Sequence, residues 1–275
     1  MTEQKAPYNA VFFDLDGTLL PMKVRDFLEG YYKVLGRRLM MSGVQIELFL
    51  DALNRGLHAM GAHTADKTNE QAFWDIFLET YAEAESPLDE AQQAYIADLL
   101  KEFYETDFNQ VGVNVVPDPA AARVVQTLHD KGYPLYLTTM PLFPREAVVA
   151  RLGWAKVDPA LFARITTFSN STAVKPQLAY YLENLAIAGC LESPERVLMV
   201  GNDTIDDLNC LQVGMDAFLV TDQLINQNNF DIGSVKHGSL EELAEWVDTL
   251  PECQNTRALE NNPNGNPLER GIRTT

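Results

Sequence analysis

Two aspartates one residue apart, Asp14 and Asp16, follow a short apolar run near the start of the chain. The run, residues 10–13, predicts a strand that is buried on both faces, as in a parallel sheet covered by helices. Alternate side chains of an extended backbone point the same way, so both carboxylates can leave the end of the strand on one side. Gly17 permits a sharp exit from the strand, and Thr18 adds a hydroxyl donor.

The closeness of the two carboxylates limits what this pair can do. At ~4 Å their repulsion is about 1 kcal/mol in water and about 4 kcal/mol at a protein surface. A hard divalent cation with oxygen ligands would offset it, and Mg²⁺ is the expected ion if a phosphate shares the site. Taken alone, the pair could equally be solvated acids at a turn, so other residues are needed to decide.

Polar side chains also end two later apolar runs. Thr138 and Thr139 follow the run at residues 135–137, and Asp203 follows the run at residues 197–200. In an open parallel sheet, ligands bind at the carboxyl ends of the strands. We therefore expect these side chains to converge with the first two aspartates.

A lysine and one more acid complete the set. Lys175 lies in a loop before an expected helix, and Asp207 stands one helical turn beyond Asp203. The acids could hold a metal, and the lysine and hydroxyls could hold an anion that the metal also touches. This combination suits phosphoryl transfer, in which neutralising and positioning the phosphate does most of the work. Each residue alone has a plainer explanation as a strand-end hydroxyl, a surface lysine or a helix cap; their joint order favours a site.

These segments resemble, in order, the four motifs of the haloacid dehalogenase (HAD) superfamily. The matching segments are Asp14-Leu15-Asp16-Gly17-Thr18-Leu19, Leu137-Thr138, Lys175-Pro176, and Gly201-Asn202-Asp203 with Asp207. The chain departs from the common pattern twice. Many members have Asn where this chain has Thr139, and many place Asp directly after the glycine, where this chain has Asn202.

The resemblance implies a phosphatase with two catalytic aspartates. Asp14 would attack the phosphorus and form an aspartyl-phosphate. Asp16 would protonate the leaving oxygen and later activate water, a role that needs a proton held near neutral pH and that neighbouring negative charge favours. Thr138, with Thr139 beside it, and Lys175 would bind the phosphate.

The resemblance also implies a Mg²⁺ cofactor. The ion would be held by the Asp14 carboxylate, the Asp16 backbone carbonyl and the Asp203 carboxylate, with waters completing an octahedron. Asp207 would support the metal-bound waters or Lys175.

The elements that position these residues fall into two groups. Apolar residues recur at helical spacing through residues 21–115, which predicts an all-helical block with no strand. A capping box at Thr68–Gln71 starts one helix, Ser86-Pro87 is expected to open the next, and Gly36 can end the first. The resemblance implies that this block is a cap that closes over the site.

From residue 116 onward the pattern alternates between strand and helix. It predicts an α/β fold: a Rossmann-like parallel sheet core with helices on both faces, plus the inserted all-helical cap domain. The core would comprise residues 1–20 and 116–250, and the cap residues 21–115. Residues 251–275 are rich in Asn, Pro and Gly, and we expect a disordered tail there.

Composition excludes several classes of function. Of 275 residues, 21 are Lys or Arg and 39 are Asp or Glu, which gives a net charge of -18. Such an acidic chain is unsuited to bind nucleic acid or an anionic membrane. It has no apolar run approaching ~20 residues and no signal-like start. Its three cysteines follow no metal-ligand spacing. We expect a cytoplasmic protein with reduced thiols and a small phosphorylated substrate; its oligomeric state is open.

Our interpretation is a Mg²⁺-dependent phosphomonoester hydrolase that acts on a small phosphorylated metabolite. A phosphomutase, a phosphonatase and a catalytically silent HAD-like binding protein remain alternatives. A dehalogenase is less favoured, because cleavage of a carbon–halogen bond does not need the acid that Asp16 supplies. In a signalling receiver domain the lysine would not precede the second group of acids, and a nicotinamide enzyme would need a Gly-x-Gly-x-x-Gly turn that is absent here.

Overall fold

A computed structural model of the chain describes residues 7–63, 66–253, 263–269 and 271–272. Its centre is a six-stranded sheet, parallel throughout, with the order β3-β2-β1-β4-β5-β6. The strands are β1 (Ala10–Phe13), β2 (Leu135–Leu137), β3 (Arg164–Ile165), β4 (Val197–Gly201), β5 (Asp216–Val220) and β6 (Lys236–Gly238). The strand order reverses at β1, which lies between β2 and β4. Open α/β sheets bind their ligands at this kind of position.

The register aligns the carboxyl ends of the three central strands. Phe13 is paired with Leu137 on one side and with Val200 on the other. The backbone amide of Asp14 donates to the Val200 carbonyl at 2.8 Å, and that of Thr138 donates to the Phe13 carbonyl at 2.7 Å. The residues that follow β1, β2 and β4 therefore leave the sheet at the same edge.

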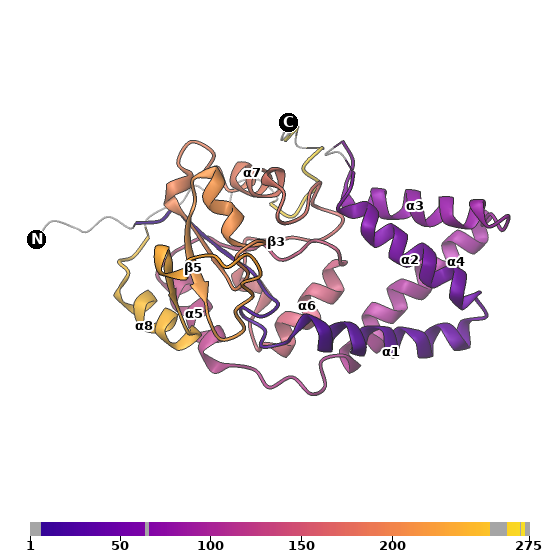
Figure 1. The fold of residues 1–275 in the computed structure, drawn as a ribbon, viewed down its shortest axis with the longest axis horizontal. Helices are drawn as coiled ribbons and strands as arrows, with labels where there is room; N and C mark the ends of the chain where they lie inside the picture. The colour runs from indigo at the N-terminus through magenta and orange to yellow at the C-terminus, as the bar shows by residue number, and fades with distance from the viewer. Residues whose placement is uncertain (1–6, 64–65, 254–262, 270, 273–275) are drawn as a thin grey trace, which may run out of the picture.

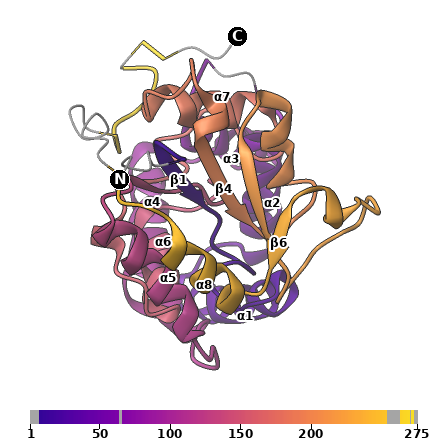
Figure 2. The same ribbon diagram turned by 90° about the vertical axis from the view of Figure 1, so that its left-hand side faces the viewer.

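Helices cover both faces of the sheet, which confirms the predicted fold class. Figure 2 shows α7 (Leu178–Ile187) on one side and α5 (Pro119–Asp130), α6 (Arg145–Trp154) and α8 (Leu240–Thr249) on the other. The 3₁₀ segment Leu208–Val213 packs on the α7 side.

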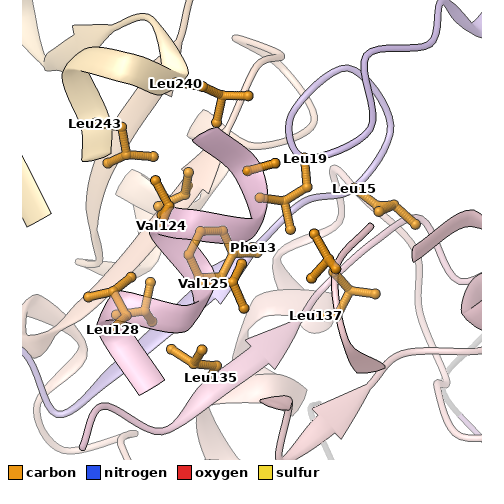
Figure 3. Packing of buried hydrophobic residues seen from close by; sticks show 14 of the residues in the cluster. Phe13, Leu15, Leu19, Val124, Val125, Leu128, Leu135, Leu137, Leu240 and Leu243 are labelled. Atoms are coloured by element: carbon orange, nitrogen blue, oxygen red, sulfur yellow. The ribbon is translucent and has the colours of Figure 1, made fainter. Parts of the chain in front are cut away.

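Alternation along β1 supplies the apolar core on each face. Val11 and Phe13 point to the face under α5, α6 and α8, whereas Ala10 and Phe12 point to the face under α7. Figure 3 shows Phe13 packed among leucine and valine side chains of β2, α5 and α8. A strand buried on both sides in this way has no solvent-facing residues, so its uninterrupted apolar sequence is explained.

A second, all-helical unit follows β1 and lies at one end of the molecule (Figure 1, right). Its helices are α1 (Val24–Ser42), α2 (Ile46–Met60), α3 (Asn69–Glu83) and α4 (Glu90–Glu102), followed by a π turn and a 3₁₀ turn over residues 103–110. They pack around an aromatic-rich cluster, to which Ala147 of α6 also contributes. In residues 21–63 and 66–115 the structure describes helices and turns but no strand. We refer to this unit as the cap.

The cap is also fixed to the core at a point distant from its two chain connections. Asn69, the first residue of α3, is fully buried. Its side-chain amide donates to the carbonyls of Pro141 and Ala173 at 3.1 and 3.2 Å, and its backbone amide donates to the Ser171 carbonyl at 2.9 Å. Because all three acceptors belong to core loops, Asn69 is a third attachment between the two units.

Two expected helix boundaries are wrong. Gly36 does not end α1, which continues to Ser42 and buries Leu39. One interior glycine costs about 1 kcal/mol, less than the ~1.5–3 kcal/mol gained by burying a leucine. Ser86-Pro87 does not open α4, because Asp89 forms a complete capping box three residues later. The capping box predicted at Thr68–Gln71 is confirmed.

The disorder predicted for residues 251–275 stays a prediction, and part of this tail is among the described residues. The Asn264 side chain accepts a hydrogen bond from the Ile165 backbone amide at 2.9 Å and donates to the Ala163 carbonyl at 3.1 Å. It thereby satisfies polar groups of the edge strand β3. The amino-acid composition of the tail does not reveal that Asn264 can pair with this strand. The rest of the tail lies outside the described residues.

Across the part of the chain that the structure describes, no helix has the length and apolar character that a membrane span would need. Cys190, Cys210 and Cys253 are free thiols.

Candidate active site

A cavity of about 360 Å³ lies where the carboxyl ends of β1, β2 and β4 face the cap. This volume is within the range of small-molecule sites. Its charged lining consists of five carboxylates and two cations: Asp14, Asp16, Asp203, Asp206, Asp207, Lys175 and Arg151. The fold therefore brings Asp14 and Asp203, which are far apart in the chain, to a single cavity.

Lys175 is the cation at the centre of the acids. Its ammonium donates to Asp14 Oδ1 at 2.8 Å and to Asp207 Oδ1 at 2.7 Å, and only 3% of the residue is exposed. Burial by itself lowers the pKa of Lys175, but the carboxylates of Asp14 and Asp207 outweigh it and hold that pKa well above its usual value. Lys175 therefore stays charged and fixes one oxygen of Asp14.

Asp207 is a buried support for Lys175. Its second oxygen accepts the backbone amides of Asn202 and Asp203 at 2.8 and 2.9 Å. Burial raises the pKa of the Asp207 carboxyl, and the charge of Lys175 opposes this rise. A Cβ on Gly201 would lie 2.2 Å from the Asp207 carboxyl carbon, so only glycine allows this approach.

The loop after β1 is fixed by contacts with the loop after β4. Gly17 adopts a φ of +85°, and a Cβ there would lie 2.4 Å from Asn202 Nδ2. The Thr18 hydroxyl lies within hydrogen-bond distance of Asp14 Oδ2 (3.1 Å) and Asn202 Oδ1 (3.0 Å). Gly17 and Thr18 thus hold the Asp14 loop against Asn202.

Arg151 of α6 binds the second aspartate. Its Nη1 donates to Asp16 Oδ2, and its guanidinium carbon lies 4.8 Å from the centre of the Phe143 ring and 5.6 Å from that of Phe27. Burial raises the pKa of Asp16, and the nearby charge of Arg151 opposes the rise. Asp16 Oδ1 and Arg151 Nη2 are buried without a hydrogen-bond partner among the described residues. Unsatisfied buried groups of this kind often mark the place of a ligand or water.

Arg151 was not among the residues expected at the site, although the sequence carries a signal for it. Arg151 is 1% exposed and lies on the buried stripe of α6 with Ala147, Val148 and Leu152. An arginine in an apolar helical stripe needs a buried partner. Asp206, whose pKa is raised by burial and by Asp203, was also not singled out.

Asp203 lines the cavity and also caps a turn. Its Oδ1 accepts the backbone amides of Ile205 and Asp206 at 2.7 and 3.0 Å. Asp203 therefore fits both expectations: it caps the turn after β4, and it faces the cavity.

The two threonines after β2 point in different directions. Thr138 Oγ1 donates to the Phe13 carbonyl at 3.3 Å and lies 3.6 Å from Met199 Sδ, so it is turned into the sheet. Thr139 lines the cavity, and its buried hydroxyl has no hydrogen-bond partner among the described residues. Adjacent residues of an extended chain face opposite ways, which accounts for the difference. This orientation does not match the prediction that Thr138 offers its hydroxyl to a phosphate.

The donor set suits a hard divalent cation. Five carboxylates face two cations in one cavity, and such an ion would offset the surplus negative charge. Among the residues described, no cluster of three or more Asp, Glu, His or Cys side chains forms a ready-made metal cage. Mg²⁺ does not require one, because it uses one or two carboxylates and keeps several waters. Arg151 binds Asp16 Oδ2, and the ligand that the family resemblance implies from Asp16 is its backbone carbonyl.

Comparison with known proteins places this geometry in context. A family model described as haloacid dehalogenase-like hydrolase matches residues 8–210. A 2-haloacid dehalogenase from Pseudomonas syringae pv. Tomato DC3000 is similar in structure, with a TM-score of 0.61, 21% identity, and coverage of 88% of this chain and 98% of that one. A predicted phosphoglycolate phosphatase from Haemophilus somnus 129pt has a TM-score of 0.51 and 18% identity, and the match covers 89% of this chain and 100% of that one. Identities this low show the fold alone. A search of the curated proteins found no significant match.

Proposed function

The chain belongs to the haloacid dehalogenase-like hydrolases, and from this premise we propose that it is a Mg²⁺-dependent phosphomonoester hydrolase. The observation that carries the proposal is the pairing of two aspartates in one cavity, each held by its own cation. Asp14 is bound by Lys175 and Asp16 by Arg151. One acid is thereby placed to act as a nucleophile and the other as a proton carrier, which suits hydrolysis in two steps.

In the first step, an oxygen of Asp14 attacks the phosphorus of the substrate. The bond between phosphorus and the ester oxygen breaks, and Asp16 gives its proton to that oxygen, so an alcohol leaves and an aspartyl-phosphate remains. Burial raises the pKa of Asp16 more than the charge of Arg151 lowers it, and the net rise favours the protonated form that this step needs. In the second step Asp16 removes a proton from water, the water oxygen attacks phosphorus, and inorganic phosphate leaves Asp14.

The remaining residues would bind and orient the phosphate. Lys175 contacts Asp14 and would offset negative charge that develops on the phosphoryl oxygens. Thr139 has a free buried hydroxyl in the same cavity and would donate to a phosphoryl oxygen; Thr138 would join only if its side chain turned.

Mg²⁺ fits the acidic end of the cavity. The Asp14 and Asp203 carboxylates and the Asp16 backbone carbonyl would hold it, with Asp207 fixing the loop through the amides of Asn202 and Asp203. When bound, the ion would neutralise phosphate charge and help to orient the ester.

The comparisons include both phosphatases and dehalogenases, so the choice between them depends on the second acid. An ester oxygen leaves as an alkoxide and benefits from a proton, whereas halide leaves without one. Asp16 supplies such a proton donor, which supports the phosphatase. A phosphomutase or a phosphonatase reaction on the same scaffold is the alternative, and each needs its own substrate to detect.

The test is turnover of 4-nitrophenyl phosphate by the purified protein with Mg²⁺. We expect hydrolysis that EDTA abolishes and that Asp14→Asn reduces by at least ~10³-fold, as for loss of other enzyme nucleophiles. Asp75→Asn, which alters an exposed acid of α3, is the matched control and should keep full activity. Unchanged turnover in Asp14→Asn refutes the nucleophile. Chloride release from 2-chloropropionate, without phosphatase activity, would assign the protein to the dehalogenases instead.

A further inference from the structure

Much of the wall of the active-site cavity is apolar. It is formed by α1 and α2 of the cap and by the loop after β2, and includes Val24, Phe27, Leu28, Leu57, Leu142 and Phe143. Such a wall would oppose the binding of a small, wholly polar phosphate ester, because its hydroxyl groups would lose water without gaining partners.

A second cavity of about 390 Å³ adjoins the first. Leu57 of the cap and Leu142 of the core line both cavities, so these two side chains form the boundary between them. Beyond the boundary, Phe73 and Trp74 of α3 and Phe168 of the core give the second cavity aromatic walls.

The polar rim of the second cavity carries balanced charge. Its charged residues are two acids, Glu70 and Glu146, and two bases, Lys101 and Arg145. Burial and the charge of Glu146 raise the pKa of Glu70. Because its two negative and two positive charges balance, this rim does not select a second anionic group on the substrate. The single phosphate site lies among the acids of the first cavity.

We propose that the substrate is the phosphomonoester of an alcohol with an extended apolar body. The phosphate lies against Asp14 and Lys175, and the body passes between Leu57 and Leu142 to the aromatic walls of the second cavity. This inference rests on the proposed function for its phosphate end. It adds the chemical class of the leaving alcohol, and it proposes that Leu57 and Leu142 select that alcohol.

The test compares straight-chain alkyl monophosphates from ethyl to octyl phosphate. Each buried methylene contributes about 0.8 kcal/mol, so kcat/KM should rise about fourfold per methylene until the chain fills the second cavity. Leu57→Trp places a larger side chain at the boundary and should lower the ratio of octyl to ethyl kcat/KM more than ~10-fold. Met40→Trp, at an exposed position of α1 outside both cavities, is the control and should keep the wild-type ratio. Leu142→Trp repeats the test from the core side if Leu57→Trp does not fold.

Calorimetry with non-hydrolysable alkyl phosphonates separates this inference from the proposed function. Phosphonate affinity that rises with chain length, and falls in Leu57→Trp, supports the apolar site even if no ester is hydrolysed; the proposed function would then be wrong. Hydrolysis that is independent of chain length, or faster with glycerol phosphate than with octyl phosphate, overturns the inference and leaves the phosphatase intact. Absence of both binding and hydrolysis overturns both.

Discussion

Arg151, which is buried, and Asp16, which is partly buried, form an ion pair that links the helix after β2 to the loop after β1. The Arg151 guanidinium also lies over Phe143 of the core and Phe27 of cap helix α1. Arginine stacks on aromatic faces while it donates in its own plane, so one side chain can make all three contacts. The position of the second aspartate is thereby tied to the position of the cap.

Loss of this guanidinium should damage both stability and activity. In Arg151→Met the Asp16 carboxyl loses its buried partner, and we expect the free energy of unfolding to fall by about 3 kcal/mol. We also expect kcat with 4-nitrophenyl phosphate to fall at least ~10-fold. Urea unfolding and steady-state kinetics measure the two effects. Arg123→Met removes an exposed ion pair of α5 and should change neither by more than about 1 kcal/mol or twofold; an equal effect in both variants would contradict the assignment.

Lys175→Met should leave two carboxylates facing each other without their shared cation. We expect a loss of about 3–5 kcal/mol in stability, because breaking a buried ion pair leaves uncompensated charge. The double variant Lys175→Met/Asp207→Asn removes one of these charges and should recover much of the stability but none of the activity. Denaturant unfolding of the two variants distinguishes the outcomes. Additive losses in the double variant would show that Lys175 and Asp207 act independently.

The two threonines after β2 should differ in their effect on catalysis. Thr139→Val removes the hydroxyl that faces the cavity, and we expect kcat/KM to fall ~10-fold or more, as for loss of a hydrogen bond to a charged group. Thr138→Val removes a hydroxyl that bonds within the sheet and should lower stability with little effect on kcat/KM. Phosphate inhibition constants provide a second readout. A larger catalytic loss in Thr138→Val would show that its hydroxyl turns toward the substrate.

Acid sensitivity of the fold should depend on Asp216, at the start of β5. Burial raises its pKa, but hydrogen bonds from Lys236 and Tyr8 outweigh burial and place the pKa below its usual value. Because the folded-state pKa is lower than the unfolded one, this residue stabilises the fold above about pH 4, and the contribution is lost as pH falls through the folded-state value. Asp216→Asn should therefore flatten the fall in stability at acid pH, as measured by urea unfolding at a series of pH values. A slope equal to that of the wild type would contradict this assignment.

The order of apolar runs was enough to predict the sheet and the meeting of Asp14 with Asp203. Parallel strands must end at a common edge, so a residue that follows one strand is near a residue that follows its neighbour. The helical character of the cap could also be predicted, from the spacing of its apolar residues. These features depend on backbone geometry that local sequence determines.

Other parts of the site depend on contacts that local sequence does not encode. Whether Thr138 or Thr139 faces the cavity depends on where the strand ends in three dimensions. Arg151 belongs to the site because α6 packs beside the β1 loop, a tertiary relationship. Asn264 forms hydrogen bonds at the edge strand β3, about a hundred residues earlier in the chain. In each case the deciding partner is remote in sequence.

The hydrogen bonds of Asn69 restrict how the cap can move relative to the core. A cap joined to the core only by its two chain connections could move gradually, but here the buried hydrogen bonds of Asn69 must break before the two units separate. Opening of the cap would then be an abrupt, all-or-none event.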